Sequence, residues 1–132
     1  MTNNTDADEI IIRLSGHRKI VINAGYGGFG LSDEAIELYA TLSGLNLIQK
    51  TDDDNKFYAI WYLDEVNDSN HWMSQDIPRD DKNLIKVVET LGERAFDNFA
   101  TLKIIEIPAD ISWHIGEYDG WEWVAEDHRT WR

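Results

Sequence analysis

The alternation of apolar and polar residues along the chain predicts an ordered set of strands and two helices. β-branched residues crowd 9–16 and 19–25, which indicates two strands joined by a hairpin turn at the segment SGHR. Apolar residues recur at helical spacing over 35–45 and over 84–91, which predicts one helix in each place. Further strands are expected at 45–50, 56–65 and 101–108, and on both sides of a turn within 111–126.

Residue types at the helix ends sharpen these boundaries. Ser32 is expected to cap the first helix, and Gly44 is expected to end it. Asp80 or Asp81 is expected to cap the second helix, which Gly92 ends. The segment 66–81 has no apolar period, so we expect an irregular loop there.

The order of elements is therefore ββα-ββ-αβββ, and 132 residues suit one domain. We expect an α+β fold with a mostly antiparallel sheet and about two helices packed on one side of it. Residues 1–8 are expected to form a flexible tail, and 9–132 the single domain.

The strongest local signal is the pair Asp119-Gly120 between two alternating runs. This pair predicts a two-residue type I′ turn, because both central positions of that turn need a positive φ. Such a turn fixes the register of the hairpin and sorts its side chains onto two faces. One face is expected to carry His114, Gly116, Tyr118, Trp121, Trp123 and Ala125. The other face is expected to carry Trp113, Ile115, Glu117, Glu122, Val124 and Glu126.

This register places Glu117 opposite Glu122, and like charges facing each other destabilise a sheet. The two carboxylates could share a proton, bind a cation, or meet a base such as Arg79 or Arg129. The simpler interpretation, which we favour, is that both side chains splay into water near the turn.

The segment AGYGGFG raises a different question. Gly25, Gly27 and Gly30 match the G-x-G-x-x-G fingerprint of dinucleotide-binding loops. In that fingerprint the helix opens within the glycines, whereas here it is expected to start after them, and two helices are too few for a βαβ array. The loop either forms an anion-binding nest at the helix start, or buries Tyr26 and Phe29 in the core; we favour the second alternative.

Charge and composition bound the possible partners. The net charge is −13, with 25 acidic against 12 basic residues, which disfavours direct binding to nucleic acid or to an anionic membrane. A basic partner is compatible with this charge, and so is simple solubility, which we favour. Residues 51–81 hold nine of the acids and two bases, so this segment is the expected face for a basic partner that binds electrostatically. The chain has no cysteine, no signal peptide at its start and no apolar run of membrane length, so we expect a soluble cytoplasmic protein.

The sequence carries no recognisable catalytic motif. Its four histidines lack zinc-ligand spacing, and no serine lies in a nucleophile-elbow context. We therefore assign no catalytic residue, no metal and no cofactor, and the sequence does not indicate an oligomeric state.

Three blocks of the sequence stand out together: INAGYGGFGLSDEAIELY, DIPRDDKNLIKVVETLG and LKIIEIPADISWHIGEYDGWEWVAEDHRTW. Together they resemble a family of small proteins carried mainly by bacteriophages and prophages. They match the family patterns I-N-x-x-Y-G-G-F-x-L-S, I-P-R-D-D and E-Y-D-G-x-E-W-V-x-E-x-H-R-x-W, in which the position of Gly25 is free. The resemblance implies phage infection of a bacterial cytoplasm as the setting, and implies no reaction.

The resemblance and the residue chemistry together define a candidate binding site. It comprises Tyr26, Gly27, Gly28, Phe29, Ser32, Arg79, Asp80, Glu117, Tyr118, Asp119, Glu122, Trp123, Glu126, His128 and Arg129. The leading hypothesis is a non-catalytic accessory protein that binds and modulates a host protein with a basic surface. The alternatives are a protein that binds or hydrolyses a nucleotide-like molecule, with the YGGF loop and Glu117/Glu122 as its site, and a structural protein of the virion or its assembly.

Overall fold

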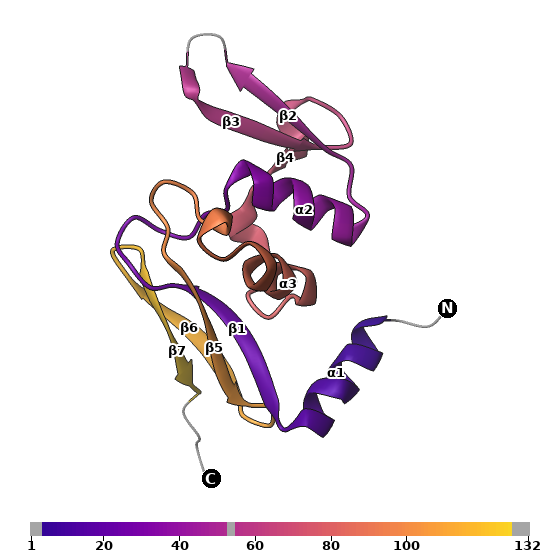
Figure 1. Ribbon diagram of the computed structural model, residues 1–132, viewed down its shortest axis with the longest axis vertical. Coiled ribbons are helices and arrows are strands. Elements are labelled where there is room, and N and C mark those ends of the chain that lie inside the picture. Colours follow the sequence, from indigo (N-terminus) through magenta and orange to yellow (C-terminus); the bar gives the residue numbers. More distant parts are fainter. Residues whose placement is uncertain (1–3, 53–54, 128–132) are drawn as a thin grey trace.

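The computed structural model describes residues 4–52 and 55–127, and within that part the chain forms three α-helices and seven strands (Figure 1). The helices are α1 (Asn4–Ser15), α2 (Asp33–Ser43) and α3 (Lys82–Leu91). The strands are β1 (His17–Asn23), β2 (Leu47–Asp52), β3 (Asn55–Leu63), β4 (His71–Trp72), β5 (Leu102–Pro108), β6 (Trp113–Tyr118) and β7 (Trp121–Glu126). Single 3₁₀ turns lie at η1 (Asp68–Asn70), η2 (Ser74–Asp76) and η3 (Gly92–Ala95).

The strands form three small antiparallel sheets, β1–β5, β2–β3–β4 and β6–β7, which confirms the α+β class. The helices α2 and α3 lie side by side between the β2–β3–β4 sheet and the β1–β5 sheet (Figure 1). The expected single sheet with helices on one side is therefore divided, and the helices separate its parts.

Strand β1 is buried on both faces, which explains its continuous apolar run. Val21 packs into the larger core with side chains of α2, α3 and Trp61 of β3. Ile20 and Ile22 point the other way, into a smaller core that β6 and β7 cover. The β1–β5 sheet is thus the middle layer that connects the helices to the hairpin.

The predicted helix ends are confirmed. The Ser32 side chain accepts a hydrogen bond from the Ala35 N–H at the start of α2, and Gly44 ends that helix with a φ of 69°. The Asp81 carboxylate accepts from two N–H groups at the start of α3, and Gly92 follows its last residue.

The strand predicted over 9–16 is wrong, because this segment belongs to α1. Residues 4–8, expected in a flexible tail, form the beginning of the same helix. Isoleucine costs a helix only a few tenths of a kcal/mol relative to better helix formers, so the β-branched run did not decide the structure. Gly16, expected in a hairpin turn, instead ends the helix with a φ of 80° and donates to the Ile12 carbonyl.

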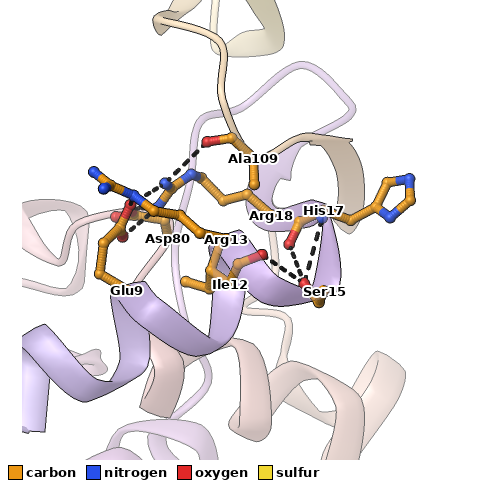
Figure 2. A network of polar contacts seen from close by, with 8 residues as sticks. All are labelled: Glu9, Ile12, Arg13, Ser15, His17, Arg18, Asp80 and Ala109. Carbon is orange, nitrogen blue, oxygen red and sulfur yellow. Dashed lines mark hydrogen bonds and ion pairs between the residues drawn. The ribbon is translucent and has the colours of Figure 1, made fainter.

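One buried arginine holds α1 against the rest of the protein (Figure 2). The Arg18 guanidinium donates to both carboxylate oxygens of Glu9, at 2.6 and 3.1 Å, and lies 3.4 Å from an Asp80 oxygen and from the Ala109 carbonyl oxygen. The Glu9 hydrogen bond raises the pKa of Arg18, and the same bond lowers the pKa of Glu9 from its ordinary value of 4.5. A second ion pair joins Asp8 to Lys82 at 2.9 Å.

The remaining strand predictions hold. Strands β2 and β3 form the expected hairpin, and residues 53–54 at its acidic tip lie outside the described residues. Strand β5 covers the predicted 101–108 segment. The loop over 66–81 is irregular apart from two 3₁₀ turns and the short strand β4.

Candidate functional site

The β6–β7 hairpin has the register that its turn predicts. All six residue pairs from Trp113–Glu126 to Tyr118–Trp121 are formed, and Asp119 and Gly120 have φ values of 51° and 87°. The face with Ile115 and Val124 packs on the smaller core, so the opposite face is directed outward.

Glu122 is buried, so the expectation that both facing carboxylates splay into water is wrong. Its carboxylate accepts a hydrogen bond from the Arg79 guanidinium, and the two side chains are only 13% and 9% exposed. Arg79 was one of the bases that the sequence suggested for this place. The Glu117 carboxylate turns away and accepts from the Gly120 N–H at 2.5 Å. The two carboxylates therefore have separate partners.

Arg79 and Glu122 also complete the edge of β1 that faces away from β5. The Val21 N–H donates to the Arg79 carbonyl at 2.8 Å, and the Asn23 N–H donates to the Glu122 carboxylate at 2.8 Å. Unpaired strand edges are sites of unwanted association, and buried N–H groups need acceptors. The Arg79 carbonyl and the Glu122 carboxylate thus satisfy both requirements, and the ion pair between the two side chains joins the loop after η2 to β7 beside β1.

The buried Phe29 ring packs against the Arg79 side chain of this ion pair. The Arg79 guanidinium carbon lies 3.7 Å from the centroid of the buried Phe29 ring, which is a cation–π geometry. The expectation that the aromatic residues of the YGGF loop pack inward is thus right for Phe29. It is wrong for Tyr26, which is exposed.

The YGGF loop and the hairpin turn are in direct contact. A Cβ atom on Gly120 would lie 2.4 Å from the Gly28 nitrogen and 2.9 Å from the Gly27 nitrogen. The Asn23 side chain bridges the two segments, because it donates to the carbonyls of Gly25 and Gly120 and accepts from the Thr101 N–H. The glycines here allow two backbones to meet, as well as allowing a turn.

Other candidate residues have structural partners. Asp80 pairs with Arg18, and the neighbouring Asp81 caps α3. Ser32 accepts from Ala35 and donates to the Arg94 carbonyl, so its hydroxyl group is engaged at the start of α2. His128 and Arg129 lie outside the described residues.

Four aromatic side chains gather on the outward side of the hairpin and its neighbouring loop. Tyr26, Tyr118, Trp121 and Trp123 are 63, 71, 43 and 46% exposed, and we call this set the aromatic face. The Tyr26 and Trp121 rings meet edge to face, with centroids 5.2 Å apart. The Trp123 indole lies across Gly116 so closely that a Cβ on that glycine would be 2.3 Å from the ring.

Reasoning from the sequence assigned Tyr26, Tyr118 and Trp123 to the candidate site and missed Trp121. The signal was present, because the hairpin register puts Trp121 on the outward face beside Trp123. Asn23 was missed as well, because the residue pattern does not indicate that its amide bridges the glycine loop and the hairpin.

Two hollows of the surface are lined by residues outside the aromatic face. One of about 600 Å³ lies between α1 and the start of α3, and is lined by Glu9, Arg18 and Asp81. Another of about 460 Å³ lies beside the start of α2, and is lined by Ser32, Trp61 and Asp97.

Over residues 4–52 and 55–127, no group of three or more histidine, aspartate or glutamate side chains is placed to hold a metal ion. None of the helices in the described chain is both long and apolar enough to cross a membrane.

Comparisons with known proteins add no family to this description. No protein-family model, no curated protein and no solved structure matches the chain.

Proposed function

We propose that this is a non-catalytic binding protein that docks a basic partner protein through its aromatic face. The observation that carries the proposal is the gathering of Tyr26, Tyr118, Trp121 and Trp123 on one outward surface. Large exposed aromatic clusters mark interaction sites in soluble proteins, and tyrosine and tryptophan dominate the binding energy of many interfaces.

The aromatic face lies on a rigid part of the fold. Its two strands are joined by a tight turn, and the buried Arg79–Glu122 pair fixes β7 to β1 from the inner side. A rigid docking surface loses little conformational entropy on binding, which favours affinity.

The charge selects the partner. Residues 113–127 contain no lysine or arginine. Asp119 at the turn and Asp127, which pairs with His114, place carboxylates beside the outward face, and the whole chain carries a net charge of −13. A positively charged surface would be steered toward this face, and a nucleic acid would be repelled. The sequence resemblance adds the setting to this proposal: a phage accessory protein acting on a host protein in the bacterial cytoplasm.

The test measures binding of a fluorescent ten-residue lysine peptide to the intact protein at several salt concentrations. We expect binding that weakens as salt rises, since surface charge interactions are screened. Asp119→Asn combined with Asp127→Asn, which removes the carboxylate beside His114 on the outward face, should weaken binding several-fold. Asparagine is also favoured at the left-handed turn position, so this change keeps the hairpin.

The matched control is Glu65→Gln combined with Asp68→Asn, which removes two exposed carboxylates from the loop after β3. This control should bind the peptide nearly as well as the unchanged protein. Equal loss in both double variants would place the docking surface elsewhere. Absence of binding, together with thermal stabilisation by a nucleotide and Mg²⁺, would favour the nucleotide-binding alternative.

A further inference from the structure

We infer that the aromatic face selects arginine over lysine in its basic partner, by stacking guanidinium groups on Tyr118, Trp121 and their neighbours. This inference rests on the proposed function and names the chemistry of its contact. The aromatic face lies on the outer side of the hairpin, and the buried Arg79–Glu122 pair lies on its inner side.

A similar arrangement lies on the inner side of the hairpin, where Glu122 of β7 meets Arg79 and Phe29 from two loops. There an arginine guanidinium lies 3.7 Å over the Phe29 ring while the Glu122 carboxylate accepts its hydrogen bond. An aromatic ring, a planar cation and a carboxylate thus form one unit within the protein. The outer side offers the ring and the carboxylate without the cation.

The carboxylate of the outer unit is Asp119. It lies at the tip of the turn, directly between Tyr118 and Trp121 in the chain, and its side chain is exposed. Tyr118 and Trp121 are also opposite each other in the hairpin register, so the turn places a carboxylate beside a pair of facing rings.

The rings are open to a stacking partner. Tyr118 is 71% exposed, and the Tyr26 and Trp121 rings meet edge to face, at an interplanar angle of 71°. This contact covers one face of one ring and leaves the other ring faces of the pair uncovered by it. A flat guanidinium fits a ring face better than a compact ammonium group. The predicted occupant is therefore an arginine-rich segment of a partner protein.

The experiment compares ten-residue arginine and lysine peptides of equal charge on the intact protein, at one fixed salt concentration. We expect the arginine peptide to bind about five-fold tighter or more, because each stacked guanidinium adds a modest preference. Tyr118→Ala and Trp121→Ala should each bring the ratio of the two affinities toward one. Leu14→Ala, an exposed apolar residue on α1, serves as the control and should leave the ratio unchanged.

The outcomes separate this inference from the proposed function. Equal binding of both peptides would overturn the arginine preference and leave the basic-partner proposal intact. Loss of both peptides' binding would overturn both. An arginine preference that persists in Tyr118→Ala and Trp121→Ala would overturn the assignment to this face. Circular dichroism of each variant verifies that the hairpin has kept its structure.

Discussion

Two arginines organise this protein, and the difference between them shows what each contributes. Arg79 and Arg18 each pair with a glutamate from another element, and both guanidiniums are nearly buried. Glu122, the partner of Arg79, is buried within the sheet layers, whereas Glu9, the partner of Arg18, is about one-third exposed. Arg79 therefore belongs to the core of the fold, while Arg18 attaches a peripheral helix.

The surroundings follow the same division. Around Arg79 the loop, the β1 edge and the hairpin meet, and each backbone contact depends on the others. Around Arg18 the helix α1 presents Ile10, Ile11 and Leu14 to solvent, so apolar burial contributes little to holding it. We expect loss of Arg79 to affect the whole molecule and loss of Arg18 to affect one helix.

The largest expected effect is that of Arg79→Ala. Removing one partner of a buried ion pair leaves an uncompensated charge, which costs about 3–5 kcal/mol of unfolding free energy. Urea denaturation measures this cost. Adding Glu122→Gln should recover part of it, because the stranded carboxylate is then neutral. A loss below about 1 kcal/mol in Arg79→Ala would show that water reaches Glu122 and that the pair is peripheral.

A smaller and local effect is expected for Arg18→Ala. The loss should be about 1–2 kcal/mol, because Glu9 and Asp80 lie near the surface and can be hydrated once the guanidinium is gone. Amide hydrogen exchange should show α1 losing its protection while β1 keeps its own. Loss of protection in β1 and β7 as well would make Arg18 equivalent to Arg79 and would remove the distinction.

Acid should act on the same helix. The pKa of Glu9 is lowered in the folded protein, chiefly by its hydrogen bond from Arg18. The stabilising contribution of Glu9 is therefore complete above its unfolded pKa, and it is lost as the pH falls through the lower folded value. In amide NMR spectra recorded from about pH 7 to about pH 3, signals of α1 should move before those of β1. In Glu9→Gln, the α1 signals should already have, at neutral pH, the positions that they reach in the unchanged protein at acid pH.

The division between the two clusters also explains what could be predicted from the sequence. The hairpin register and the caps at Ser32 and Asp81 follow from local rules that the fold obeys. The Arg79–Glu122 pair joins residues 43 apart in the chain, and the sequence offered it only as an alternative to the favoured interpretation, in which both carboxylates point into water. The helix α1 was missed because ion pairs from Glu9 to Arg18 and from Asp8 to the distant Lys82 hold it, and a local apolar pattern does not indicate such pairs.

The candidate site was predicted in part for a similar reason. Alternation in a hairpin predicts that Tyr118 and Trp123 share a face, and the structure places them so. The contact between Gly27 and Gly120 joins segments that are more than ninety residues apart. Neither glycine indicates this contact, because glycine also serves in ordinary turns.

A third arginine–glutamate pair lies on the surface, and removing its arginine should cost the least unfolding free energy of the three. Arg94 pairs with Glu34 on the surface, where the side chains are 70% and 49% exposed. Exposed pairs are screened by water and lose side-chain entropy, so Arg94→Ala should cost less than about 1 kcal/mol in urea denaturation. The cost should therefore rise from Arg94 through Arg18 to Arg79, following the burial of each carboxylate partner. If Arg94→Ala cost as much as Arg18→Ala, burial of Glu9 would contribute nothing, and the attachment of α1 would depend on charge alone.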